Sequence, residues 1–155
     1  VFGGVYKLAA VENEKGEIIP KIKISENIEK ITTPHFKKLY RLYDNDSGKA
    51  IADLICLYDE EIDESKPLTI FDPNYTWKRK TITNFTAKSL LEPVFKNGHC
   101  VYKRLTTEQV RSYCTRQTET LWDEVKRLDN PHRYYVDLSE KLWSLKHAML
   151  NERGH

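Results

Sequence analysis

The stretch TTEQVRSYCTRQTETLWDEVKRL, residues 106–128, is the longest segment of the chain with an unbroken hydrophobic period. Its apolar side chains recur every three or four positions, which predicts an amphipathic helix with one apolar stripe. The stripe consists of Val110, Tyr113, Cys114, Leu121, Trp122, Val125 and Leu128. Because such a helix must cover an apolar surface, we expect the rest of the chain to form the sheet on which it lies, with Leu121 and Trp122 as its anchors.

Both ends of this helix have sequence signals. Thr106 and Gln109 have the spacing of a capping box, in which each side chain bonds the backbone N–H of the other residue. At the other end Asn130 precedes Pro131, and the residue before a proline disfavours the helical conformation. The sequence therefore predicts one continuous helix that ends near Leu128.

Length, composition and charge bound the class of protein. The chain has 155 residues, 39% of them hydrophobic, which is enough to bury a core as a single domain over residues 1–155. Its 25 basic and 23 acidic residues leave a net charge of +2, so charge gives no general attraction to nucleic acid or to an anionic membrane. No apolar run has the length of a membrane span. The cysteines (Cys56, Cys100 and Cys114) are odd in number and widely spaced, which favours buried free thiols in a reducing, cytoplasmic compartment.

Strand signals alternate with turn signals before the long helix. Residues 37–43 and 49–58 flank the turn sequence Asp44-Asn45-Asp46-Ser47-Gly48 and predict a β-hairpin. Further strands are predicted at residues 5–12, 21–25, 69–71, 75–82 and 100–102, and one or two helical turns at residues 86–91. In the segment 21–25, Ile22 and Ile24 alternate with lysines and are predicted to face the core.

A second helix is predicted at the C-terminal end. Asp137 and Glu140 have capping-box spacing, and the apolar stripe consists of Leu138, Leu142, Leu145 and Met149. Strands thus come first and helices last, which is the α+β arrangement. We predict antiparallel β-sheet hairpins in the N-terminal two-thirds, packed with two amphipathic C-terminal helices.

Two candidate metal sites are weighed against simpler interpretations. Asp44, Asp46 and Gly48 invite comparison with a calcium-binding loop, but they are out of register and Ile55 stands where the bidentate glutamate belongs, so a hairpin turn explains them better. His99 and Cys100 could begin a metal site, yet no further ligands follow at zinc-like spacing.

Two other histidines have predicted structural places. His132 could cap helix carbonyls, and His147 falls on the polar side of the last helix. From the residues alone we assign no catalytic, cofactor-binding or metal-binding residue to this chain.

The densest basic run consists of Trp77, Lys78, Arg79 and Lys80. An aromatic residue beside three cations could hold a phosphorylated ligand or track the backbone of a nucleic acid. The run is also typical of an edge strand, where lysines discourage pairing with another chain. We favour the edge-strand interpretation and expect no specific binding of nucleic acid.

Several stretches, in order along nearly the whole chain, resemble the C-terminal region of bacterial nicotinate phosphoribosyltransferases. In the first half they are Gly3-Gly4-Val5-Tyr6-Lys7-Leu8, Lys23-Ile24-Ser25-Glu26-Asn27, Lys30-Ile31-Thr32 with Pro34, Tyr40-Arg41, Gly48-Lys49-Ala50 and Ala52-Asp53. In the second half they are Ile70-Phe71-Asp72-Pro73, Trp77-Lys78-Arg79, Leu121-Trp122-Asp123-Glu124, Asn130-Pro131-His132, Val136-Asp137-Leu138-Ser139 and Leu142-Trp143. His35 is a local departure, because the family usually has a glycine after this proline.

The resemblance implies a longer parent enzyme. Such enzymes join nicotinate to the ribose of phosphoribosyl pyrophosphate, driven by ATP hydrolysis and with Mg²⁺, to give nicotinate mononucleotide for NAD synthesis. Their fold is an irregular α/β barrel plus an α/β domain built from both chain ends, and they usually work as homodimers. The phosphorylated histidine and the ligand-binding loops of the family lie earlier in the chain. The resemblance therefore assigns no catalytic residue here, and the fragment alone is expected to be inactive.

Two hypotheses of different class follow. In the first, the chain is a structural part of the enzyme and packs against its N-terminal segment and barrel; in the second, it is a free-standing binding module that uses residues 77–80 on a phosphorylated ligand or nucleic acid. The sole methionine is Met149 and the chain opens on VFGGVYKL, so we favour a piece of a longer protein. The strand residues 5–11 and some of the aromatic residues Tyr6, Tyr40, Tyr43 and Tyr75 would then lack partners, and we expect the isolated chain to self-associate.

Overall fold

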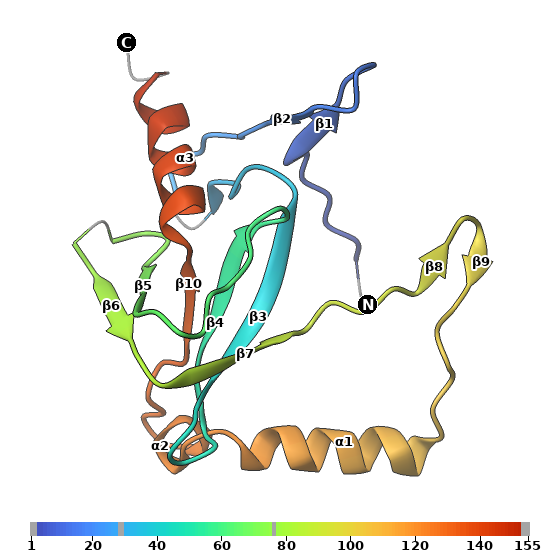
Figure 1. Ribbon diagram of the computed structural model, residues 1–155, viewed down its shortest axis with the longest axis vertical. Coiled ribbons are helices and arrows are strands. Elements are labelled where there is room, and N and C mark those ends of the chain that lie inside the picture. Colours follow the sequence, from blue (N-terminus) through green and yellow to red (C-terminus); the bar gives the residue numbers. More distant parts are fainter. Residues whose placement is uncertain (1–2, 28–29, 76, 153–155) are drawn as a thin grey trace.

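A curled β-sheet of six strands forms the centre of the molecule, and short hairpins and helices extend from it (Figure 1). The computed structural model describes residues 3–27, 30–75 and 77–152. The strands are β1 (Ala10–Glu12), β2 (Ile18–Pro20), β3 (Lys37–Asp44), β4 (Ala50–Leu57), β5 (Leu68–Phe71), β6 (Arg79–Ile82), β7 (Phe85–Ser89), β8 (Phe95–Lys96), β9 (His99–Cys100) and β10 (Tyr135–Leu138). The helices are α1 (Thr107–Glu119), α2 (Asp123–Lys126) and α3 (Glu140–Asn151). The predicted α+β class is confirmed. None of the helices in the described ranges is long and apolar enough to cross a membrane.

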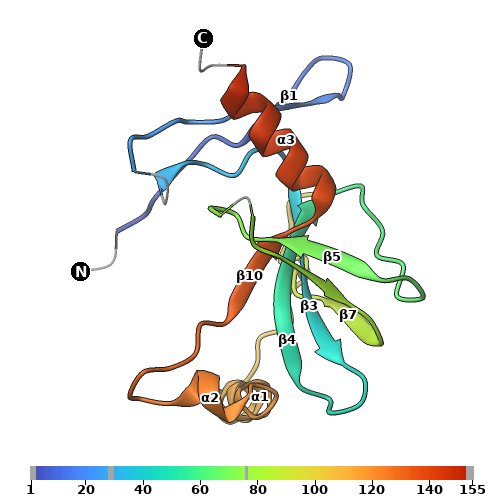
Figure 2. The same cartoon turned by 90° about the vertical axis from the view of Figure 1, so that its left-hand side faces the viewer.

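The two edges of the sheet are joined by a very short link. The strand order is β6-β5-β10-β4-β3-β7, so the outermost strands are consecutive in the chain and are connected by Thr83 and Asn84. A flat sheet would place its outer strands about 24 Å apart, at about 4.8 Å per strand step. Three Cα–Cα steps of the link reach about 11 Å at most. The sheet must therefore curl until its edges converge at this link, and Figure 2 shows β5 and β7 on the same side of β4.

The core lies inside this curl. Leu42, Ala52, Leu54, Ile70, Ile82 and Phe85 form one buried cluster. Ile82 and Phe85 flank the link between the two edges, yet both pack on the same central strands β3 and β4. Helix α3 covers one end of the sheet with Leu142, which is completely buried. The hydrophobic effect thus favours the closed arrangement, since opening the curl would expose this cluster to water.

The β3–β4 hairpin is confirmed as predicted. The strands pair antiparallel, with Leu42 opposite Ala52 and Arg41 opposite Asp53. In the turn the Asp44 carbonyl accepts a hydrogen bond from the Gly48 N–H at 2.8 Å. Gly48 has φ +67°, which glycine adopts without steric strain. The aspartates of this segment therefore serve a turn, as the hairpin interpretation requires.

The prediction for residues 137–140 is wrong. Residues 135–138 form β10, which runs parallel to β4 with Val136 opposite Asp53. Asp137 and Leu138 are therefore buried strand residues and not the start of a helix. The residue that caps α3 is Ser139, whose hydroxyl accepts a hydrogen bond from the Leu142 N–H at 3.2 Å. The six-stranded sheet is consequently mixed, because a parallel strand lies between the predicted antiparallel hairpins.

The predicted continuous helix is also wrong, although its start is confirmed. The capping box is formed, with Gln109 N–H donating to Thr106 Oγ1 at 3.3 Å and Thr106 N–H donating to Gln109 Oε1 at 2.9 Å. Helix α1 ends at Glu119 because the Thr120 carbonyl accepts from the Ala50 N–H of β4 at 2.8 Å. The Thr120 hydroxyl donates to the Gln117 carbonyl at 2.7 Å. Because the Thr120 carbonyl is occupied by β4, it cannot accept the bond that would continue the helix.

Helix α1 does not lie on the sheet either. None of its residues is buried, and Figure 1 shows it running away from the end of the sheet. Trp122, the predicted anchor, lies after the break and is 43% exposed.

Several shorter predictions also need correction. The segment 86–91 is not helical, because its residues pair with β3 as strand β7. The strand predicted at residues 5–12 is limited to β1, and the one predicted at 21–25 is absent from the described structure, where β2 precedes it. Ile22 is buried as predicted, but Ile24 is 45% exposed. Strand β5 confirms the strand predicted at residues 69–71 and is one residue longer, and β6 confirms the end of the strand predicted at 75–82, of which residue 76 lies outside the described residues. Strand β9 overlaps the strand predicted at 100–102 only at Cys100.

Candidate functional site

The basic run of residues 77–80 lies at the edge of the sheet. Arg79 and Lys80 begin the outermost strand β6, so the edge-strand interpretation is confirmed. Lys78 does not extend freely into solvent, because its Nζ lies 4.5 Å from the centre of the Tyr75 ring. The Trp77 ring packs against the same tyrosine, with 5.4 Å between ring centroids, and is 73% exposed. The run therefore forms an aromatic and cationic rim beside β6.

Next to this rim is a small pocket that we call the Asp137 pocket. It has a volume of about 350 Å³ and is lined by Asp72, Trp77, Lys78, Arg79, Lys80, Tyr135 and Asp137. Asp72 and Asp137 are both buried, with 3% and 4% of their surface exposed. The Asp137 Oδ1 atom is buried and has no hydrogen-bond partner among the described residues. Burial, followed by the charge of Asp72, raises the pKa of Asp137 above the usual range of a carboxyl group.

The two aspartates are held in different ways. Asp72 follows β5 and closes a turn, in which its Oδ1 accepts from the N–H groups of Asn74 at 2.9 Å and Tyr75 at 3.0 Å. Its other oxygen lies 3.8 Å from Arg133 Nη2. Asp137 is fixed instead by its position in β10, and no described residue donates to its Oδ1 atom. Asp72 is thus held by two hydrogen bonds and by Arg133, while the Oδ1 atom of Asp137 has no hydrogen-bond partner among the described residues.

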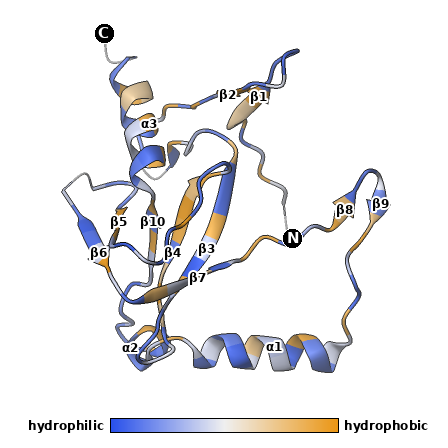
Figure 3. Cartoon of the chain, in the orientation of Figure 1, coloured by the Kyte–Doolittle hydropathy of each residue, from blue (hydrophilic) through white to orange (hydrophobic). Residues whose placement is uncertain are grey.

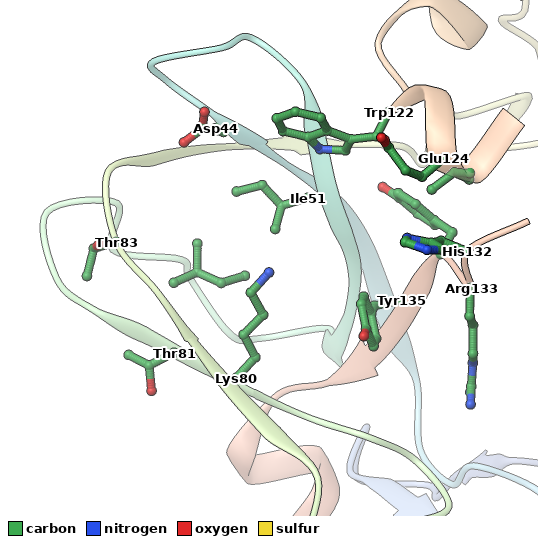
Figure 4. A pocket seen from close by; sticks show the side chains of 13 residues that line it. Asp44, Ile51, Lys80, Thr81, Thr83, Trp122, Glu124, His132, Arg133 and Tyr135 are labelled. Carbon is green, nitrogen blue, oxygen red and sulfur yellow. The ribbon is translucent and has the colours of Figure 1, made fainter.

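A larger and more open pocket adjoins the Asp137 pocket along β6. It has a volume of about 770 Å³ and shares Lys80 and Tyr135 with the smaller pocket. Its lining consists of Asp44, Ile51, Lys80, Thr81, Ile82, Thr83, Trp122, Glu124, Val125, His132, Arg133, Tyr134 and Tyr135. In Figure 4, Trp122 and Glu124 lie on one side, Thr81 and Thr83 on the other, and Arg133 points away from the centre. Residues from β6, α2 and the segment before β10 thus meet at one hollow.

A closed polar network on the outer face of the sheet fixes the segment before β10. Arg41 donates to both carboxylate oxygens of Asp53, from Nε at 2.8 Å and from Nη2 at 3.0 Å, and the Tyr134 hydroxyl donates to Asp53 Oδ1 at 2.9 Å. Burial and the charge of Asp53 raise the pKa of Tyr134, so its hydroxyl stays a donor. All three groups satisfy one another, and a two-pronged Arg–carboxylate bond fixes geometry strongly. The network therefore positions Tyr134 and Tyr135 at the open pocket.

The structure separates the other residues that the sequence analysis singled out. His99 and Cys100 lie exposed in β9, and neither lines one of the two pockets. The prediction of buried thiols is confirmed for Cys56 and is wrong for Cys100 and Cys114, which are both exposed. His132 lines the open pocket, but the group that bonds the helix is its backbone N–H, which donates to the Glu124 carbonyl at 2.8 Å. His147 stacks on Trp143 in α3, with ring centroids 4.0 Å apart. Among the described residues, no cluster of three or more His, Cys, Asp or Glu side chains could hold a metal ion.

The sequence analysis missed the pairing of Asp72 with Asp137 and the network of Arg41, Asp53 and Tyr134. The β3–β4 hairpin register would have placed Arg41 opposite Asp53, so part of the network had a local signal. No local signal pointed to the pairing of Asp137, because Asp72 is distant in sequence. In addition, Asp137 was predicted to begin a helix, whereas it lies in strand β10.

The comparisons with known proteins agree with this fold. Residues 36–146 match the family described as "Nicotinate phosphoribosyltransferase C-terminal domain". The matched range includes every strand of the curled sheet and the lining of both pockets. Among solved structures, the crystal structure of human nicotinic acid phosphoribosyltransferase is similar, with a TM-score of 0.67 and 22% identity; the match covers 76% of this chain and 23% of that one. At this identity the likeness concerns the fold.

Curated relatives are similar over nearly the whole chain. The nicotinate phosphoribosyltransferase of Bacillus subtilis is 41% identical over 150 residues, which are 97% of this chain and 30% of that protein. The human nicotinate phosphoribosyltransferase is 28% identical over 148 residues, or 95% of this chain and 26% of that protein. This chain thus spans less than a third of the length of these relatives. Since the family match takes in more than half of its residues, the chain belongs to the nicotinate phosphoribosyltransferase C-terminal domain family.

Proposed function

We propose that this chain is the C-terminal structural domain of a nicotinate phosphoribosyltransferase. The parent enzyme joins nicotinate and phosphoribosyl pyrophosphate, with ATP hydrolysis and Mg²⁺, to give nicotinate mononucleotide for NAD biosynthesis. The observation that carries this proposal is the 41% identity to the Bacillus subtilis protein of that name over 97% of the chain. The proposal includes a cytoplasmic homodimer as the working form of the parent enzyme.

In this proposal the domain supports the active site from outside. The described residues form a curled sheet with a buried core and two pockets beside β6, and Asp53 accepts hydrogen bonds from both Arg41 and Tyr134. Such a network holds a surface in shape and offers no free nucleophile. We infer that substrates and Mg²⁺ bind to the preceding part of the enzyme, and that this domain alone does no chemistry.

Two preparations test the proposal. The full-length protein that contains this domain should form nicotinate mononucleotide from nicotinate, phosphoribosyl pyrophosphate, ATP and Mg²⁺. The 155-residue chain, assayed in the same mixture, should form none above a blank without protein. An inactive full-length protein would overturn the enzyme assignment, and product from the isolated chain would overturn its structural role.

The alternative of a free-standing binding module is tested on the basic run. Because Lys78 is engaged with Tyr75 and the chain has a net charge of only +2, we expect no mobility shift of nucleic acid at physiological salt. A shift that persists at that salt concentration, and that is lost when Lys78, Arg79 and Lys80 are changed to alanine, would favour the binding module instead.

A further inference from the structure

The longest excursion from the sheet is an ordered segment that stands apart from the core. We call residues 91–119 the arm; it contains the β8–β9 hairpin and helix α1. Its two ends are fixed to the hairpin β3–β4, by Leu90 N–H donating to the Leu39 carbonyl at 2.9 Å and by Ala50 N–H donating to the Thr120 carbonyl at 2.8 Å. Figure 1 shows the arm extending to one side of the sheet, and Figure 2 shows α1 end-on below it.

The arm has well-formed local structure. The turn of its hairpin is Asn97-Gly98, with φ of +49° and +77°, which suits a tight two-residue β-turn. Val101 N–H donates to the Val94 carbonyl at 2.9 Å and extends the pairing beyond β8 and β9. Helix α1 begins with the complete capping box described above. The sequence of the arm therefore specifies this conformation.

The arm nevertheless buries nothing. Every residue from 91 to 116 is exposed, including its large apolar ones. These are Leu91, Val94, Phe95, Val101, Tyr102, Leu105, Val110 and Tyr113, and Phe95 is 69% exposed. Hydrophobic segments recur along the arm in Figure 3. A lone two-stranded hairpin and a helix of 13 residues are each marginal in water, so the arm needs a surface to pack on.

Helix α1 shows which of its faces would pack. Val110, Tyr113 and Cys114 lie on one face, in line with Gln117, which accepts a 3.4 Å hydrogen bond from the Tyr43 hydroxyl. The opposite face carries Glu108, Ser112, Thr115 and Glu119. This division is the pattern of a helix that covers a neighbour with one side.

The charges of the arm indicate the chemistry of that neighbour. The arm carries five basic side chains against three acidic ones, so its charge is moderately positive. The basic residues are Lys96, Lys103, Arg104, Arg111 and Arg116, and the acidic residues are Glu92, Glu108 and Glu119. A surface complementary to the arm would be apolar at its centre and acidic at its rim. Such a surface would satisfy both the apolar residues and the surrounding cations.

We propose that the arm clasps the preceding part of the same polypeptide, through an apolar patch with an acidic rim. This inference rests on the proposed function, in which the chain is one domain of a longer enzyme. In the proposed parent enzyme a large part of the polypeptide would precede this domain, because the match covers only 30% of the Bacillus subtilis relative and the family is a C-terminal domain. An intramolecular partner is present at a high effective concentration, which favours it over a second copy.

The free thiols of the arm provide the test in the full-length protein. Cys114 lies on the face of Val110, whereas Cys56 is buried in the sheet, where burial raises its pKa to about 11 and makes it an unreactive internal reference. A maleimide reagent followed by peptide mapping measures the labelling rate of each thiol. We expect Cys114 in the native protein to react at least about tenfold more slowly than in urea. The reagent reaches Cys114 only when the arm is undocked, and docking worth about 1.4 kcal/mol lowers the undocked fraction about tenfold.

A matched pair of variants tests the face. Val110→Glu places a carboxylate on the docking face, and Thr115→Glu makes a similar change on the opposite face. Val110→Glu should raise the Cys114 labelling rate by about tenfold, because loss of docking returns the undocked fraction to that of a free arm. Thr115→Glu should leave the rate unchanged, because residue 115 lies on the opposite face. Hydrogen exchange of residues 107–119 in the parent protein gives a second readout that requires no variant, and these amides should be protected.

Three results would overturn the proposal. The first is labelling of native Cys114 at its unfolded rate. The second is an equal effect of the two variants. The third is protection that disappears on dilution together with dissociation of an oligomer, which would make a second copy the partner. Because labelling requires no substrate, protected Cys114 in a protein that forms no nicotinate mononucleotide would refute the enzyme assignment and leave the docking intact.

Discussion

His35 has a backbone conformation that residues with side chains rarely adopt. Its φ is +76°, in the left-handed region that favours glycine. The surrounding contacts hold it there: its N–H donates to the Ala9 carbonyl at 2.7 Å, and Lys37 Nζ donates to the carbonyls of Thr33 at 2.9 Å and His35 at 2.6 Å. This geometry explains why a glycine usually follows Pro34 in the resembled enzymes.

We predict that His35→Gly stabilises the protein. Relief of a left-handed conformation is worth about 1–2 kcal/mol, and the extra freedom of glycine in the unfolded chain offsets about 0.5–1 kcal/mol of it. The free energy of unfolding in urea should therefore rise by up to about 1 kcal/mol. His35→Ala is the control, since it removes the ring but keeps the strain. Equal stabilities of the two variants would show that the backbone stores no strain at this turn.

Asp137 predicts a dependence of stability on pH. Its pKa in the folded protein is raised, so the folded state holds a proton that the unfolded state releases above about pH 4. The contribution of this group to stability is therefore greatest at low pH and falls as the pH rises through the folded pKa. Asp137→Asn keeps the shape and cannot ionise. The variant should be more stable than the parent at neutral pH, and the difference should vanish at low pH.

Urea unfolding of both proteins across this pH range measures the effect. The difference between the two curves isolates Asp137 from the other carboxyl groups, because those are common to both. A difference that stays constant with pH would mean that the pKa of Asp137 is the same in the folded and unfolded states. A variant that loses stability relative to the parent as the pH rises would mean that Asp137 is ionised and paired in the folded protein.

At the scale of the elements, local signals succeeded and long-range pairing overrode the others. The β3–β4 hairpin and the start of α1 were predictable, because a five-residue turn and a capping box act between neighbours in sequence. Strand β7 resembles a helix locally, yet pairing with β3 decides its conformation. Strand β10 pairs with β4 across a long stretch of chain, and its Asp137 imitates a helix cap. The Asp137 pocket could not be predicted without β10.

The break after α1 changes the expected importance of Trp122. A fully buried tryptophan costs about 3–5 kcal/mol when it is changed to alanine. Trp122 is 43% exposed at the open pocket, so Trp122→Ala should cost clearly less than this. Phe85→Ala is the comparison, because Phe85 is 1% exposed in the core cluster and should show the full loss. Urea midpoints at equal slopes would measure both, and a similar loss for the two variants would mean that Trp122 is covered.

At the scale of the whole molecule, closure of the sheet and exposure of the arm have opposite consequences. The link between β6 and β7 brings both edges together, and Asn84 ties it to the neighbouring turn through its carbonyl, which accepts from the Asn45 N–H at 3.1 Å. The central sheet can therefore bury its core without help. The arm and the first residues cannot, since Val5 and Tyr6 are 87% and 86% exposed.

This contrast predicts how the isolated 155-residue chain behaves in solution. Tyr40 and Tyr43 are half-buried in β3, so the expected contact surface is the arm together with Val5 and Tyr6. A net charge of +2 gives little repulsion between copies, and exposed apolar patches favour association. The average mass in sedimentation equilibrium should therefore rise with concentration. Val110→Glu should reduce this rise and Thr115→Glu should not, because the change in charge is equal and only the face differs. A chain that stays monomeric at high micromolar concentration, with the amides of α1 exchanging freely, would show that the arm has too little affinity for apolar surfaces to act as a clasp.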